Sequence, residues 1–121
     1  MNFFLRQRAA AKSLAAIFFC VFAIATIAQT QTPTPSPALL VLNKSANQLA
    51  IVDPATKQVI ARIDTGEGPH EVTASDDGKL AFVTNYGAKT PGHSLTVIDL
   101  IAQKEIHRVD LGPLGRPHGI L

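Results

Sequence analysis

Residues 38–121 contain an internal repeat, which restricts the fold more than any other feature of the sequence. Three pairs of identical residues coincide when its two copies are overlaid: Asn43 with Asn85, Asp53 with Asp99, and His70 with His118. The offset grows from 42 to 48 along the overlay, and the extra residues fall in "GAKTPGHS" and "LGPLGRPH". Both segments are rich in glycine and proline, so the insertions fall in turns. This pattern indicates a duplicated module of β-strands.

Each copy of the repeat has the pattern of short strands joined by tight turns. The complete unit, 70–111, contains "HEVTAS", "LAFVTNY", "SLTVIDL" and "EIHRVDL", and it follows "ALLVLNK", "QLAIVD" and "QVIARID". Apolar residues alternate or form runs of three or four, and β-branched residues are common. We predict hairpins at Asp76–Lys79 and around Pro54–Lys57. We expect no helix beyond residue 30, and a helix within 38–121 would contradict the repeat.

Sheets of four short strands, repeated about every 40–45 residues, are typical of the blades of a β-propeller. Runs such as "ALLVL" and "LAFV" are apolar on both faces, which favours sheets covered on both sides. The predicted fold class is therefore all-β, with about two propeller blades of four-stranded antiparallel sheet. A propeller ring needs four or more blades. We therefore expect 38–121 to be the N-terminal part of a larger ring; the alternative is a short chain that closes its ring by oligomerising.

The N-terminal segment has the pattern of a secretory signal peptide over residues 1–28. Three basic residues precede an apolar run of 15 residues, Leu14 to Ala28, and small residues follow. A membrane anchor is the alternative, but it would need about 20 apolar residues to span the bilayer. The signal predicts export to the periplasm or cell surface. Residues 29–37, "QTQTPTPSP", are predicted to be a solvated linker with no further role.

Removal of the signal changes the charge of the chain. The full sequence has 11 Lys and Arg against 9 Asp and Glu, and the signal contains three of the basic residues, so the remainder has a net charge of −1. No basic face then favours nucleic acid or an anionic membrane. The single cysteine also lies in the signal, so the mature chain has no disulfide.

The strings "GPHEVTASDDGKLAFVTN", "LTVIDL" and "RPHGI" resemble the YVTN-type propeller repeat of secreted bacterial and archaeal proteins, including surface-layer-associated ones. The resemblance covers nearly all of residues 38–121. The sequence departs from the motif where Phe82 replaces tyrosine, where Glu71 replaces the glycine after His70, and in "LVLN" of the first unit. The resemblance implies rings of about seven blades.

His70 and His118 are the strongest candidate binding residues because they recur at one position of the repeat. A metal or cofactor in a central channel is one interpretation, since related propellers that hold copper or haem line their channels with histidines. The other is structural: Pro-His-Gly shapes the start of each innermost strand, and the imidazole bonds the backbone of a neighbouring blade. We favour the structural interpretation, because architecture repeats while active sites break symmetry, and we expect no metal or other cofactor.

The remaining candidates are weaker. Asn85 and Tyr86, with the following loop to His93, are the one feature specific to the second unit, and variable loops are where recognition is placed. His93 is predicted to be solvated in this loop, and His107 to lie on an outermost strand. Asp53 and Asp99 are expected to cap strand ends through Asx turns. Asp76 and Asp77 lack the spacing of a calcium loop.

No nucleophile elbow, phosphate loop or metal-spaced Cys/His set is present in the sequence. The favoured function is an exported, non-catalytic propeller that acts as a binding or surface-associated scaffold for a protein or small molecule, with self-association through open blade faces as a further option. The alternative is the propeller part of an enzyme or redox protein, resembling sugar lactonases or nitrous oxide and haem reductases, with catalytic groups in other blades.

Overall fold

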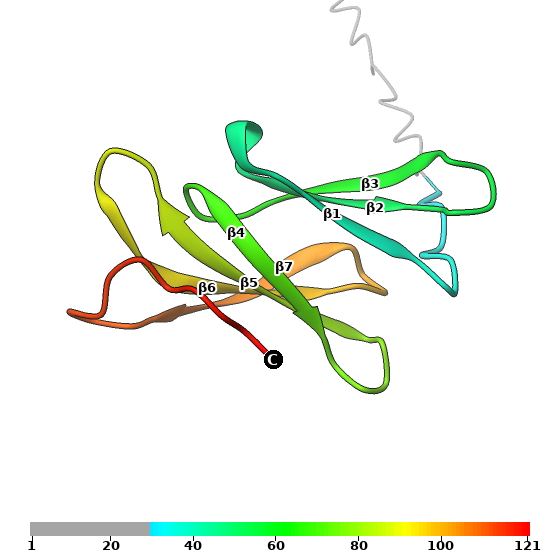
Figure 1. The fold of residues 1–121 in the computed structure, drawn as a ribbon. Helices are drawn as coiled ribbons and strands as arrows, with labels where there is room; N and C mark the ends of the chain where they lie inside the picture. Colours follow the sequence, from blue (N-terminus) through cyan, green and yellow to red (C-terminus); the bar gives the residue numbers. More distant parts are fainter. Residues whose placement is uncertain (1–29) are drawn as a thin grey trace, which may run out of the picture.

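The computed structural model describes residues 30–121, in which the chain folds as two antiparallel β-sheets (Figure 1). The first sheet has the strand order β1-β2-β3 and the second β4-β5-β6-β7. The strands are β1 (Leu39–Asn43), β2 (Gln48–Val52), β3 (Val59–Asp64), β4 (Pro69–Ala74), β5 (Leu80–Gly87), β6 (Pro91–Asp99) and β7 (Lys104–Asp110). The all-β class is confirmed. The predicted signal peptide, residues 1–28, lies outside the described residues.

The hydrophobic core lies between the two sheets, which face each other in Figure 1. Strand β1 packs against β4 and β3 against β7. Alternate residues of the strands point into this layer because side chains of a strand alternate between its faces. The buried apolar residues are Leu49, Ile51 and Ile63 from the first sheet and Ala81, Val83, Ile98 and Leu100 from the second sheet and its edge. Among the described residues, no helix is long and apolar enough to cross a membrane.

The far face of the first sheet differs from the prediction of two covered faces. Leu39 and Val41 of β1 are 53% and 40% exposed. Their neighbours Leu40 and Leu42 point the other way and pack against the core. Within residues 30–121 the first sheet is therefore covered on one side, because the second sheet packs on that side alone.

The two copies of the repeat build the same hairpin, which joins β2 to β3 in the first sheet and β6 to β7 in the second. Asp53 accepts a hydrogen bond from the backbone N–H of Ala55 at 2.8 Å, and Asp99 accepts one from Ile101 at 2.8 Å. Four residues after each aspartate, Lys57 and Gln103 adopt left-handed backbone conformations with φ of 60° and 51°. The Asx-turn interpretation of both aspartates is confirmed.

The predicted turn at Asp76–Lys79 is also confirmed. Gly78 has φ of 66°, and its N–H donates to the carbonyl of Ser75 at 2.8 Å. Asp77 accepts hydrogen bonds from the Ser75 hydroxyl and the Lys79 N–H. These contacts, the Ser75 hydroxyl first, lower the pKa of Asp77 from 3.8 to about 2 because they stabilise the charged carboxylate.

The expectation of no helix beyond residue 30 is wrong by one short element, the 3-10 helix η1 (Lys44–Ala46). It connects β1 to β2. The Asn43 side chain accepts from the N–H of Ala46, and Asn47 ends the turn with φ of 55°. Asparagine is favoured at both positions, because its short side-chain amide forms hydrogen bonds with the nearby backbone and because the residue tolerates a left-handed conformation. The turn replaces no predicted strand, so the two sheets still follow the repeat.

The predicted loop around "GAKTPGHS" is wrong, because β5 runs on to Gly87 and β6 begins at Pro91. Gly87 has φ of 85°, and a Cβ on either Gly87 or Gly92 would overlap backbone of the other. Two glycines therefore let the strand ends approach, and the added residues lengthen the hairpin. His93 is consequently a strand residue, although its side chain is 59% exposed as expected of a solvated group.

The last residues do not form the predicted innermost strand at "HGIL", since 111–121 contain no strand. Within residues 30–121 no further strand lies beside this segment to pair with its backbone. The segment is held instead by contacts with side chains. The N–H of Ile120 donates to Glu71 at 3.1 Å.

The linker is also more than a solvated spacer. Gln31 donates to the carbonyl of Ala102 at 3.0 Å, and Gln103 donates to the carbonyl of Thr32 at 2.7 Å. Thr34 donates to the carbonyl of Leu100. The linker therefore lies along the β6–β7 hairpin, because its polar side chains and free carbonyls match unpaired groups of that turn.

Candidate functional site

The candidate site begins at an irregularity in β4. Pro69 pairs with Asn85 and Val72 with Val83, so His70 and Glu71 together face the single residue Thr84. This is a β-bulge. Neighbouring side chains of a regular strand point to opposite faces, whereas a bulge turns them toward each other. The Thr84 hydroxyl accepts from the N–H of Glu71 at 3.0 Å and fixes the bulge.

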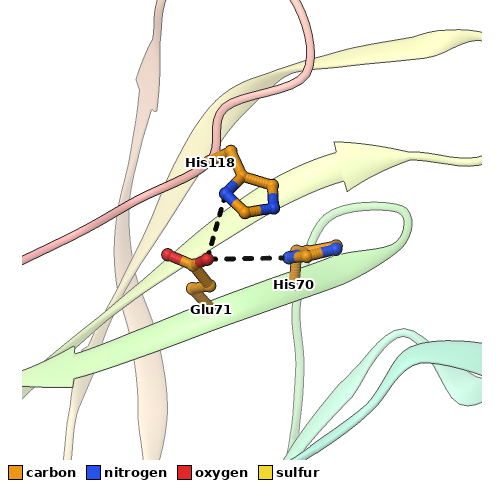
Figure 2. A group of neighbouring side chains, drawn as sticks. All are labelled: His70, Glu71 and His118. Atoms are coloured by element: carbon orange, nitrogen blue, oxygen red, sulfur yellow. Dashed lines mark ion pairs between the residues drawn. The ribbon is translucent and has the colours of Figure 1, made fainter.

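The C-terminal segment brings His118 to this bulge (Figure 2). Nδ1 of His118 lies 3.1 Å from Oε1 of Glu71, and Nδ1 of His70 lies 4.0 Å from the same oxygen. The two imidazole rings have centroids 4.5 Å apart. Figure 2 shows that both rings turn a nitrogen toward one carboxylate oxygen. The repeat-equivalent histidines are therefore direct neighbours, with Glu71 between them.

Glu71 is the residue that sequence reasoning missed. Its Oε2 accepts the N–H of Ile120 at 3.1 Å, which holds the carboxylate with Oε1 toward the histidines. The signal was visible in the sequence, because Glu71 stands where the repeat motif has glycine.

His70 does not make the expected hydrogen bond to a neighbouring backbone. Among the described residues, its Nδ1 is buried without any hydrogen-bond partner. The side chain as a whole is 31% exposed, so the buried nitrogen is the part that points into the cluster. An unpaired buried polar atom costs about 1–3 kcal/mol and calls for a specific explanation. Within residues 30–121, Nδ1 of His70 therefore does not form the backbone hydrogen bond of the structural interpretation.

Tyr86 extends the cluster with a third ring. Its centroid is 4.9 Å from that of His70 and 6.1 Å from that of His118. Two cations lie over Tyr86: Nζ of Lys44 at 5.0 Å and the Arg116 guanidinium at 4.9 Å from the ring centroid. Such distances allow cation–π attraction. The surface therefore combines three rings, two cations and one carboxylate.

Asn85 does not belong to this surface. It is 1% exposed, and its Oδ1 accepts from the N–H of Gly66 at 3.0 Å. Its Nδ2 donates to the hydroxyls of Ser94 and Thr96, each at 2.9 Å. A Cβ on Gly66 would overlap the Asn85 side chain. Asn85 therefore holds the segment between β3 and β4 in place through hydrogen bonds, and its role is structural.

The other two histidines lie apart from the cluster. Nδ1 of His93 is 3.0 Å from Oδ1 of Asp110 on the exposed β6–β7 edge. The N–H of Gly112, and then His93, lower the pKa of Asp110 by stabilising its charged form. His107 is exposed on β7, an edge strand of the second sheet. Among the described residues, His70, Glu71 and His118 form the group of three potential metal ligands, and neither His93 nor His107 belongs to it.

The chain is thus an all-β protein of two repeat-related sheets with a histidine-rich surface at the start of β4. Among solved structures it is similar to hydrazine synthase of Kuenenia stuttgartiensis, with 28% sequence identity and a TM-score of 0.59. The similarity covers 64% of this chain and 22% of that chain, so this chain matches about a fifth of the larger protein. No protein-family model and no curated protein matches the sequence.

Proposed function

We propose that the two sheets are neighbouring blades of a YVTN-type β-propeller in an exported protein. The equivalent hairpins at Asp53 and Asp99 support this assignment, as does the face-to-face packing of two sheets of sequential antiparallel strands. Blades of a propeller are sheets of this kind, stacked around an axis. In this arrangement β4 is an innermost strand and β7 an outermost one.

We further propose that the protein is a non-catalytic binding or surface-associated scaffold, and that its recognition surface is the cluster at the start of β4. The observation that carries this proposal is the gathering of the His70, Tyr86 and His118 rings, with two cations over the ring of Tyr86. Rigid aromatic rings lose little conformational entropy on binding, and partly exposed charged groups orient a ligand. His118 is 59% exposed, which leaves the surface accessible.

Amide chemical shifts of the isotope-labelled full chain, titrated with a library of small polar molecules, would test this surface. We expect the responding amides to belong to Lys44, His70, Tyr86, Arg116 and His118. Tyr86→Ala should abolish the response, whereas Phe82→Ala serves as an aromatic control in the same strand. Hits that map only to other surfaces would contradict the proposal.

Export has its own test. The tagged chain, expressed in a Gram-negative host, should be recovered from the periplasm with residues 1–28 or a closely similar segment removed. Recovery of the uncleaved chain in the cytoplasm would contradict export, and recovery in the inner membrane would favour the anchor.

An enzyme is the second candidate, and the likeness to hydrazine synthase favours it. In that case the catalytic groups lie in other parts of a larger protein. The genomic sequence downstream of codon 121 would distinguish the two. A c-type haem motif or an appended cupredoxin domain would support an enzyme, whereas further propeller repeats without such groups would support a binding scaffold.

A further inference from the structure

We propose that His70, Glu71 and His118 bind one divalent first-row transition-metal ion, of which Zn²⁺ is the representative. The inference rests on the binding function proposed above and deepens it, because it names a ligand for part of the same surface. It replaces the expectation that both histidines are purely architectural. The argument depends on the geometry of three side chains.

One potential ligand atom from each of these residues lies within 4.8 Å of the other two. Two ligands at about 2.1 Å from a tetrahedral ion are about 3.4 Å apart. Nδ1 of His118 and Oε1 of Glu71, at 3.1 Å, already meet this spacing. Nδ1 of His70, at 4.0 Å from Oε1, must move closer to this oxygen by roughly half an ångström to reach the same spacing.

The carboxylate is oriented as metal-bound carboxylates are. Ligating side chains are commonly fixed by hydrogen bonds from outside the coordination sphere. The Ile120 N–H occupies Oε2 of Glu71 and leaves Oε1 directed at the two imidazoles. Glu71 is thus prepared to donate one oxygen.

Without an ion, the three side chains leave one group unsatisfied. Nδ1 of His118 lies within ion-pair distance of Oε1, at 3.1 Å. The 4.0 Å from Oε1 to Nδ1 of His70 is too long for a hydrogen bond, and that nitrogen is buried without a partner among the described residues. A metal ion supplies that partner, since the neutral imidazole nitrogen is a strong ligand for zinc. The ion therefore accounts for all three groups together.

The ligand set selects the class of ion. Two nitrogens and one carboxylate oxygen suit zinc, iron, cobalt or nickel, whereas calcium and magnesium prefer oxygen ligands throughout. Three protein ligands leave a position for water or another ligand. Lys44 and Arg116 lie over Tyr86 and oppose a dication electrostatically, so binding should be weaker than at a four-ligand structural zinc site.

Isothermal titration of the full chain with Zn²⁺ tests the proposal. A Cys20→Ser background removes the single thiol, which would otherwise compete for zinc. We expect one equivalent to bind. His70→Ala, His118→Ala and Glu71→Gln should each weaken binding by at least about tenfold, because even outer-shell changes cost about 10–100-fold. His93→Ala and His107→Ala are the matched controls and should leave the affinity unchanged.

The zinc K-edge absorption spectrum of the unmutated metal-bound protein keeps the test independent of how the variants fold. A first shell with two imidazoles supports the proposal; a shell with fewer than two overturns it. A folded wild-type chain that binds no Zn²⁺, or variants that bind as tightly as wild type, would also overturn it. A wild-type chain that binds no Zn²⁺ can still show the amide-shift response to small polar molecules. Failure of the metal proposal and failure of the proposed binding function are therefore distinguishable.

Discussion

The first and second sheets use the same repeat, but asparagines at matched positions have different roles in the two. Asn43 ends β1 at the surface and caps the turn η1. Asn85 is buried beneath the segment that connects β3 to β4, where it holds the N–H of Gly66. The difference arises because the second sheet has an additional strand, β4, and a connecting segment that leads into it. Among residues 30–121, no such segment covers the corresponding part of the first sheet.

Strand β4 also explains why the candidate binding residues gather on the second sheet. β4 contributes both His70 and Glu71 through its bulge, and the segment after β7 returns His118 to the same point. The first sheet contributes one flanking cation, Lys44, from η1. The strands and hairpins common to both copies of the repeat thus form the sheets, whereas β4, which has no counterpart in the first sheet within residues 30–121, contributes most of the candidate site.

The largest effect is expected from the core that both sheets share. Ile51→Ala in the first sheet and Ile98→Ala in the second should each lower the free energy of unfolding by about 2–5 kcal/mol, because both residues are fully buried. Urea unfolding followed by far-UV circular dichroism would measure this in a chain without tryptophan. Leu39→Ala, on the exposed face, is the control. A much smaller cost for Ile51→Ala than for Ile98→Ala would show that the first sheet does not share the core.

A second pair of variants separates the matched asparagines. Asn85→Ala should cost about 2–3 kcal/mol, because it removes the buried side-chain hydrogen bonds of Asn85 to Gly66, Ser94 and Thr96. Asn43→Ala should cost about 0.5–1 kcal/mol, as expected for an exposed cap. The same unfolding measurement applies. Equal costs for the two variants would remove the contrast between the sheets.

Substituting glycine at the left-handed hairpin positions tests whether the hairpins of the two sheets are equivalent. Lys57→Gly and Gln103→Gly should each stabilise the protein by about 0.5 kcal/mol, because glycine adopts positive φ without steric cost but loses more chain entropy on folding. Ala102→Gly, a neighbour without positive φ, should instead destabilise it. Opposite signs for Lys57→Gly and Gln103→Gly would argue against equivalent hairpins.

The smallest effect is expected from the turn aspartates, in the dependence of stability on pH under acidic conditions. The pKa of Asp77 is lowered to about 2, and that of Asp53 is lowered chiefly by the N–H of Ala55 and then the Thr56 hydroxyl. A lowered folded-state pKa stabilises the protein above the unfolded value, and this contribution is lost as the pH falls through the folded value. The melting temperature of Asp77→Asn should therefore fall less than that of the wild type between about pH 4 and pH 2. Asp53→Asn should act in the same direction.

Asp76→Asn, which removes one charge from the same turn, controls for net charge in this measurement. Identical pH profiles for wild type and Asp77→Asn would show that the turn contacts contribute nothing in solution.

Much of the fold was predictable because it depends on local chemistry. Strands followed from β-branched and alternating residues, and hairpins from Asp53, Asp99 and Gly78. The errors occurred where a nearby segment changed the outcome. Gly87 and Gly92 approach each other and extend a hairpin where a loop was expected, and the linker found partners on the β6–β7 turn.

The site was predictable in part. His70, His118 and Tyr86 were identified and do lie together, whereas Asn85 was identified and proved structural. Glu71 was noticed as a departure from the repeat motif, but its role depended on a bulge that strand periodicity does not reveal.

The sequence by itself determined an all-β chain of repeated hairpins, because turn residues and strand patterns act over a few neighbouring positions. Only the tertiary structure decided that Asn85 is buried while Asn43 is exposed, since that depends on which segment covers each one. It also decided that His118 meets Glu71 and His70 across 47 and 48 positions of sequence. Contacts over such separations are set by how sheets pack and how the chain returns between them, and no local pattern encodes them.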